Sequence, residues 1–230
     1  MRYLFPLSPW SQQRQFEKAT WVYPCHLAAY ATYLRDEGHE VIWNADTRNW
    51  SCGSTSELFY QKEIRDDFQI SIPFEKLPFP DRTFTDAKNP RWQYYGNYRY
   101  HPATHMMVSN LCWYGKCSFC IDTYKLEHGE KRGVRSVAHV MEEIDDLIAN
   151  GYREVFDDSG TFPVGAWLEE FHRKMQKRKH KIHIGVNMKP IKMDYKLLAD
   201  SGVVFTLVGI ESANQETVDK IKKGQKSEDI

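Results

Sequence analysis

The amino-acid sequence predicts an α/β protein in which a small strand–helix–strand segment precedes a partial barrel of about four strand–helix units. Three observations support this prediction. Residues 2–44 follow a strand, helix, strand pattern. From residue 105 onward, short apolar strands alternate with helical patterns. Between these parts, prolines and aromatic residues interrupt any regular period. Alternating strands and helices favour a parallel sheet with helices packed outside it.

Residues 1–45 are expected to form an incomplete Rossmann-like βαβ segment. Its helix is predicted from apolar side chains at helical spacing, namely Leu27, Tyr30, Ala31 and Leu34. Gly38 follows as a C-terminal stop, and residues 40–43 turn apolar in the manner of a strand. Parallel strands joined by a helix cross over right-handedly, so this is the first step of a doubly wound sheet. Further steps of that kind do not follow.

Residues 46–104 are expected to be an ordered connection rather than a domain. The prolines that exclude a long helix here are Pro73, Pro78, Pro80, Pro90 and Pro102. The segment is also too aromatic for a disordered linker. Its richest aromatic stretch, RWQYYGNYRY at 91–100, is compatible with lining a substrate pocket or with packing as a surface connection.

Residues 105–230 are expected to hold the four strand–helix units. The expected strands are 105–111, 154–156, 181–186 and 203–210. The expected helices are 137–148, 168–175, 195–200 and one that starts at Ser212 or Asn214 and stops before Gly224. The first helix is the clearest, because Ser136 opens its apolar stripe and Gly151 closes it. Active sites of such barrels lie at the C-terminal ends of the strands.

The charge balance and hydropathy exclude several classes of protein. Among 230 residues, 31 are basic and 31 acidic, so no whole-chain attraction to nucleic acid or anionic membrane is expected. The basic run 173–179 is better explained as a solvated helix end. No apolar run reaches the roughly eighteen residues of a membrane helix, and the N-terminus lacks a secretory signal. The expected compartment is the cytoplasm.

Three of the five cysteines, Cys112, Cys117 and Cys120, fall within the stretch LCWYGKCSFC. In a reducing compartment, such a cluster indicates a metal site rather than disulfides. Three thiolates that hold a 4Fe-4S cube leave one iron without a protein ligand, open to a substrate or cofactor.

Two other interpretations of the cysteines stay open. One is a structural zinc site completed by His128, Cys52 or another donor. The other is a non-catalytic electron carrier, which needs a fourth thiolate, and Cys25 and Cys52 lie far away in sequence.

Three phrases resemble the radical S-adenosylmethionine (radical SAM) superfamily: LCWYGKCSFC at 111–120, VFDDSGTF at 155–162 and LVGIESANQETVDKIKKG at 207–224. They are most similar to the branch that often carries an N-terminal cobalamin-binding domain, whose start residues 2–44 resemble. The resemblance implies a TIM-like radical SAM barrel, with residues 105–230 as its N-terminal part. Because the family barrel usually has six units, it also implies either a truncated chain or fragment, which we favour, or a barrel whose remaining wall comes from another chain.

The resemblance implies a 4Fe-4S cluster on the three cysteines and S-adenosylmethionine chelated to the open iron. An electron from a flavodoxin- or ferredoxin-like donor would then release a 5′-deoxyadenosyl radical, which takes hydrogen from a substrate that the sequence does not identify. No histidine has the setting of an axial cobalt ligand, and His26 and His39 are interpreted as surface or helix-end residues, so the sequence itself does not support a cobalamin site.

The resemblance also implies roles for residues at the strand ends, although it assigns no side chain a catalytic role. The methionyl amine would meet Asp157, Asp158 and Ser159, the ribose Glu211 and Ser212, the adenine Phe119, and the methionyl carboxylate Asn187 and Lys189. Local structure offers other interpretations: a turn signal for 157–160, a capping box for Ser212 with Gln215, and a solvated loop for Asn187. Four residues separate Cys112 from Cys117, where the family usually has three.

Overall fold

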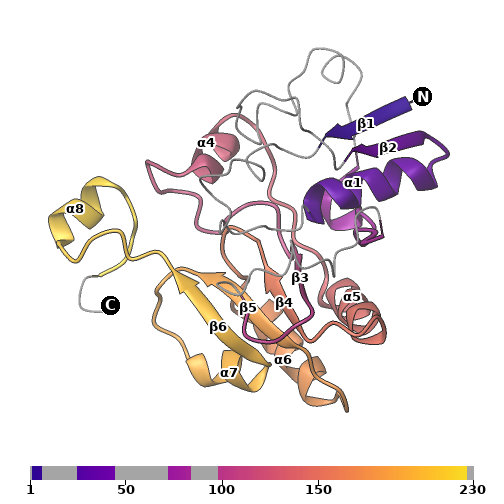
Figure 1. Cartoon of the computed structure of the whole chain (residues 1–230). Helices are drawn as coiled ribbons and strands as arrows, with labels where there is room; N and C mark the ends of the chain where they lie inside the picture. Colours follow the sequence, from indigo (N-terminus) through magenta and orange to yellow (C-terminus); the bar gives the residue numbers. More distant parts are fainter. Residues whose placement is uncertain (1, 7–24, 45–71, 84–97, 227–230) are drawn as a thin grey trace, which may run out of the picture. The chain divides into compact units, whose positions relative to one another are not determined.

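The computed structural model describes residues 2–6, 25–44, 72–83 and 98–226. The chain divides into two compact units, Met1–Arg99 and Tyr100–Ile230 (Figure 1). Most of the predicted connection, 46–104, lies outside the described residues.

The first unit has the strand–helix–strand order that the sequence predicts. Strands β1 (Arg2–Pro6) and β2 (Glu40–Asn44) are parallel and pair along their full length, and α1 (Cys25–Asp36) joins them in the sequence. The apolar side of α1 is buried at Ala28, Ala31 and Leu34.

A described stretch of the connection packs against α1. It contains the short 3-10 helix η3 (Phe74–Lys76). The backbone N–H of Asp81 donates to Thr32 Oγ1 on α1 (2.9 Å), and the Asp81 carboxylate pairs with Arg35 of the same helix. These contacts fix residues 72–83 beside α1.

The second unit is built on a sheet of four parallel strands in the order β3-β4-β5-β6. The strands are β3 (Ala103–Met106), β4 (Glu154–Asp157), β5 (His183–Met188) and β6 (Val203–Val208). The helices are α4 (Ile121–Glu127), α5 (Val137–Ala149), α6 (Ala166–Gln176), α7 (Tyr195–Asp200) and α8 (Gln215–Lys220). Along the sheet, α6 lies between α5 and α7 (Figure 1). The arrangement confirms the predicted α/β class.

Local signals explain the two helices that cover the core. Ser136 Oγ accepts a hydrogen bond from the His139 N–H (3.2 Å) and so caps α5. The stripe buried by α5 consists of Val137, Val140, Met141, Ile144 and Leu147. Helix α6 buries Leu168, Phe171 and Met175 in the same core. Both stripes follow the 3.6-residue period read from the sequence.

Each of the four predicted strands is displaced by some residues at one end or both, and two of these differences lie next to the site. Strand β3 stops at Met106 instead of continuing to 111, because the next backbone N–H groups bond to side chains rather than to a strand. Strand β5 extends to Met188, because its pairing with β6 continues as far as Val208. Asn187 therefore lies within β5 and not in a loop after it.

Two predictions about helices also need correction. Asn214, not Ser212, caps α8, since its Oδ1 accepts from the Thr217 N–H (2.9 Å). Gln215 does not complete a capping box, because its amide donates to Asp219 and to the Gln225 carbonyl. Helix α4, directly after the cysteine loop, was not predicted at all.

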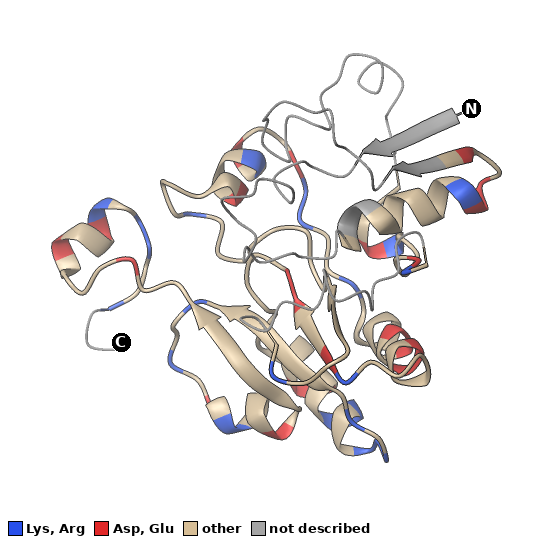
Figure 2. Ribbon diagram, viewed as in Figure 1, with Lys and Arg blue, Asp and Glu red and all other residues tan. Residues whose placement is uncertain are grey.

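Strand β6 lies at one edge of the sheet, and most of its residues are exposed. In the described part of the chain, β6 pairs with β5 alone. Its large apolar side chains are exposed, as are those just after it: Val204, Phe205, Leu207, Val208 and Ile210. Helix α8 carries charged residues of both signs (Figure 2). Its Lys220 pairs with Glu216 (2.8 Å). None of the helices in the described ranges has the length and apolar character needed to cross a membrane.

Candidate metal and cofactor site

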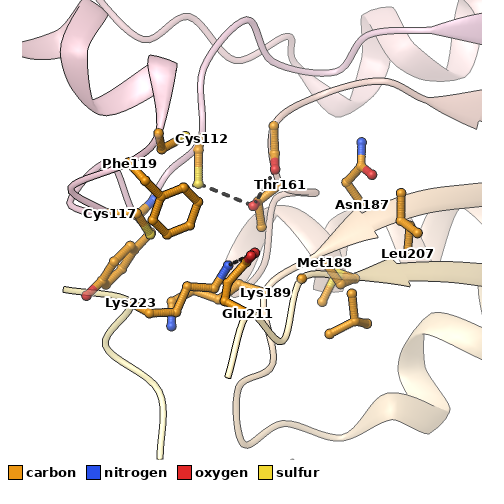
Figure 3. A pocket seen from close by; sticks show the side chains of 15 residues that line it. Cys112, Cys117, Phe119, Thr161, Asn187, Met188, Lys189, Leu207, Glu211 and Lys223 are labelled. Atoms are coloured by element: carbon orange, nitrogen blue, oxygen red, sulfur yellow. Dashed lines mark hydrogen bonds and ion pairs between the residues drawn. The ribbon is translucent and has the colours of Figure 1, made fainter. Parts of the chain in front are cut away.

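One pocket of about 450 Å³ lies where the strands of the second unit end (Figure 3). The cysteine loop, residues 112–120, forms one wall, and the ends of β5 and β6 form another. Its lining residues are Cys112, Tyr114, Cys117, Phe119, Cys120, Gly160, Thr161, Asn187, Met188, Lys189, Leu207, Val208, Gly209, Glu211 and Lys223. The pocket therefore occupies the end of the sheet where barrel enzymes place their chemistry.

The three clustered cysteines all line this pocket and are only partly buried. None of the three is in a disulfide. Burial raises the pKa of Cys117; Lys223 opposes this, while Cys120 and Cys112 add to it. The raised pKa favours the protonated thiol of Cys117. A bound metal ion would favour the thiolate instead, because metals bind the deprotonated sulfur.

Of the donors named for a zinc site, His128 is the one that the structure describes, and it does not join the cysteines. His128 does not line the pocket; its ring stacks on Tyr124 at 3.9 Å. Cys52 lies outside the described residues. Within the ranges that the structure describes, no three His, Cys, Asp or Glu side chains are already arranged around a metal position.

The cysteine loop is tied to the segment that follows α8. Tyr114 Oη donates to the Lys222 carbonyl (2.9 Å), and the Ser118 N–H donates to the Ile221 carbonyl (3.0 Å). Gly224, at φ +58°, lies so close that a Cβ there would overlap the Tyr114 hydroxyl. These contacts hold the four-residue spacer between the first two cysteines in place.

Two buried ammonium groups lie in the pocket. Lys189 Nζ donates to the Gly224 carbonyl (2.8 Å) and lies 4.4 Å from the centre of the Tyr114 ring. Lys223 Nζ lies 3.1 Å from Glu211 Oε1 and 5.6 Å from the centre of the Phe119 ring. Burial lowers the pKa of Lys189. Together they give the pocket a cationic side.

Glu211 has an unusual backbone conformation. Its φ of +64° lies in the left-handed region, which is unfavourable for a residue with a side chain. Its carboxylate faces Lys223 within the pocket (Figure 3). Strained residues of this kind cluster at functional sites.

The acidic turn consists of Asp157, Asp158 and Ser159 at the end of β4. Two of these residues, Asp157 and Ser159, face the protein interior. The Val108 N–H donates to Asp157 Oδ1 (2.8 Å), and the Ser109 N–H donates to Ser159 Oγ (2.8 Å). Ser159 Oγ in turn donates to Asp157 Oδ1 (2.8 Å). Burial raises the pKa of Asp157 to about 7. Asp157 and Ser159 thus anchor the chain between β3 and the cysteine loop.

The third member of the turn, Asp158, has a side chain that solvent reaches. Protein atoms around the carboxyl nevertheless desolvate it partly and raise its pKa to about 6. None of the three residues of the turn lines the pocket.

The structure brings some of the other predicted residues together. Phe119, Asn187 and Glu211 line the pocket with the cysteines, although Phe119 is 54% exposed. Asn187 Nδ2 also donates to the Ser159 carbonyl (3.0 Å). Ser212 does not line the pocket, and its Oγ accepts from the Asn214 N–H (3.1 Å).

Sequence reasoning missed several pocket residues, among them the polar side chains of Tyr114, Thr161 and Lys223. Each lies within a phrase that was singled out for other residues. Lys223 directly precedes Gly224, and Thr161 follows the acidic turn at the end of β4. The position at a strand end was the available signal for Thr161.

A family model, described as Radical SAM superfamily, matches residues 106–230. A structure of the cobalamin-dependent S-adenosylmethionine radical enzyme OxsB, with aqua-cobalamin and S-adenosylmethionine bound, is similar at a TM-score of 0.52 and 17% identity, over 69% of this chain. The chain spans only 24% of that OxsB chain. No curated protein sequence matches significantly.

Two further solved structures are similar at a TM-score of 0.44. One is the radical S-adenosylmethionine methyltransferase TsrM from Kitasatospora setae with cobalamin and a [4Fe-4S] cluster bound, at 22% identity over 54% of this chain and 26% of that chain. The other is apo, selenomethionine-labelled OxsB, at 14% identity over 88% of this chain and 35% of that chain.

Proposed function

The chain belongs to the radical SAM superfamily, and from this premise we propose that Cys112, Cys117 and Cys120 bind a 4Fe-4S cluster and that the adjoining pocket binds S-adenosylmethionine. The family predicted from the three sequence phrases is confirmed, and the similarity to OxsB supports the partial TIM-like barrel. The main observation in favour of the cofactors is that three thiols from one loop line a single pocket at the strand ends.

The residues of the pocket suit these cofactors. Cysteine thiolates are the usual ligands of iron–sulfur clusters. A pocket of about 450 Å³ is within the roughly 300–1,000 Å³ typical for small ligands. When bound, the cluster and S-adenosylmethionine supply one-electron cleavage to a 5′-deoxyadenosyl radical that abstracts hydrogen from a substrate.

The chain's own side chains would hold and orient the nucleotide. The ammonium groups of Lys189 and Lys223 suit a carboxylate, since charge-assisted hydrogen bonds are the strong ones. Glu211 and Asn187 offer oxygen acceptors to hydroxyl and ammonium groups, and the Phe119 ring offers a flat apolar surface for the adenine. We also propose Asp158 for the methionyl amine: its exposed carboxyl lies outside the pocket lining but only two residues before the lining residue Gly160.

The activity of the whole protein is also a proposal. We propose an enzyme of the cytoplasm that receives its electron from a flavodoxin- or ferredoxin-like protein and acts on a substrate still to be identified. The OxsB structure contains cobalamin. We leave cobalamin out of the proposed function, because the sequence of residues 1–45 does not itself support a cobalamin site.

Metal analysis followed by a cleavage assay tests the proposal. After anaerobic reconstitution, the full chain should contain about four irons and four sulfides. The reduced, reconstituted protein should then convert S-adenosylmethionine to 5′-deoxyadenosine. Zinc without acid-labile sulfide would replace this proposal with the structural zinc site. A loaded cluster without 5′-deoxyadenosine would favour the non-catalytic carrier.

A further inference from the structure

The three cysteine sulfurs lie in different hydrogen-bonding environments. Cys112 Sγ accepts from the Tyr114 N–H (3.4 Å) and donates to Thr161 Oγ1 (3.2 Å; Figure 3). In the described part of the chain, the sulfurs of Cys117 and Cys120 take part in no hydrogen bond. Cys112 is therefore the thiol that the protein itself contacts most closely.

Thr161 is held in place independently of the cysteine loop. It is 5% exposed and follows Gly160, where a Cβ would come within 3.2 Å of Cys112 Cβ. The next residue, Phe162, donates its N–H to the Asn187 carbonyl of β5 (2.8 Å). The sheet thus fixes the Thr161 hydroxyl beside the sulfur.

The direction of the Cys112–Thr161 hydrogen bond depends on the state of the sulfur. As a thiol, Cys112 donates its proton to Thr161 Oγ1, whose own O–H donates to the Gly160 carbonyl (2.6 Å). A metal-bound sulfur is a thiolate and has no proton to donate. A threonine hydroxyl can rotate, so its O–H is then free to turn toward the sulfur.

We propose that Thr161 is a positioning residue that donates a hydrogen bond to Cys112 Sγ when this sulfur ligates the cluster, and that it thereby raises the cluster's reduction potential. The inference rests on the proposed function. Hydrogen bonds to the ligand sulfurs are among the factors that set the potential of iron–sulfur clusters. A donated hydrogen bond stabilises the reduced, more negative cluster, and so favours its reduction.

The test compares the reduction potentials of reconstituted full-length variants without S-adenosylmethionine. Thr161→Val keeps the side-chain shape and removes the hydroxyl, whereas Thr161→Ser keeps the hydroxyl. We expect the midpoint potential, followed by electron paramagnetic resonance, to become more negative in Thr161→Val and to stay near wild type in Thr161→Ser. Iron and sulfide contents are measured in each sample.

Thr123→Val is the matched control. Thr123 is also a buried threonine, at 7% exposed, but its hydroxyl has no hydrogen-bond partner in the described part of the chain. The same change there should leave the potential at the wild-type value. If Thr123→Val shifted the potential as much as Thr161→Val, the inference would be wrong.

The remaining outcomes separate this inference from the proposed function. A wild-type chain that takes up no iron and sulfide overturns both. A loaded wild-type protein whose potential Thr161→Val leaves unchanged overturns the inference alone. If Thr161→Val takes up less iron, Thr161→Ala replaces it, and a potential equal to that of Thr161→Ser would then overturn the inference.

Discussion

The inner strand β4 and the outer strand β6 belong to the same parallel sheet but differ sharply in burial. All four residues of β4 are buried, whereas five of the six residues of β6 are exposed. The end of β4 leads into Asp157 and Ser159, which anchor the root of the cysteine loop. The end of β6 contributes pocket residues from an open edge. The pocket thus has one wall anchored by buried hydrogen bonds and one wall with few supporting neighbours.

The largest expected effect tests the wall formed by the cysteine loop. Cys117→Ala should abolish both cluster uptake and 5′-deoxyadenosine formation, because two thiolates remain for a cluster that needs three. Cys25→Ala, which changes a buried cysteine of the first unit, should retain iron and sulfide at the wild-type ratio. Iron and sulfide analysis after anaerobic reconstitution measures both variants. Loss of the cluster in Cys25→Ala would contradict the ligand assignment.

The second effect tests the contact between the cysteine loop and the segment that follows α8. Gly224→Ala should reduce iron uptake several-fold, because the new Cβ overlaps Tyr114 and displaces the cysteine loop. Gly151→Ala is the matched control, since Gly151 also has a positive φ (+79°) but a Cβ there meets nothing within 4 Å. Both variants carry a similar backbone penalty. Equal iron uptake by the two would show that the Tyr114 contact does not matter for the loop.

A matched pair of substitutions measures the difference in burial directly. Val155→Ala on β4 should lower the free energy of unfolding by about 2 kcal/mol, because it leaves a cavity at a side chain that is 0% exposed. Val208→Ala on β6, at 38% exposed, should change it by less than about 0.5 kcal/mol. Urea unfolding followed by circular dichroism provides both values. Similar losses would mean that the edge strand is covered in solution.

The last effect shows only in the pH dependence of stability and concerns Asp157 at the buried end of β4. Burial raises the pKa of Asp157 to about 7, so the folded state favours the protonated carboxyl. The unfolded value is about 4. Asp157 therefore stabilises the fold fully below pH 4, and this contribution is lost as pH rises toward 7, by up to about 1.4 kcal/mol per pH unit.

Asp157→Asn should flatten this part of the profile. Its side-chain oxygen can still accept from the Val108 N–H, but it does not titrate. Urea midpoints between pH 4 and 8 give the comparison. A wild-type stability that rises with pH through this window more steeply than in the variant would reverse the sign and contradict the burial of a protonated carboxyl.

Local signals made much of the second unit predictable. Helix α5 follows its sequence pattern because the Ser136 cap and the apolar stripe both depend on residues within a few positions. The cysteines were predicted as one cluster because their spacing is short. Thr161 was missed because its contact with Cys112 joins residues 49 apart in the sequence. The inward roles of Asp157 and Ser159 were missed for the same reason, since their partners are about as distant.

The left-handed backbone of Glu211 carries a consequence for engineering. Glycine adopts a φ of +64° without a steric penalty. Glu211→Gly is therefore a substitution that relaxes the backbone while removing the carboxylate that faces Lys223. Selection for thermal robustness alone would weigh the relief of this strain against the loss of the carboxylate beside the buried Lys223 ammonium, and would not test ligand recognition at all.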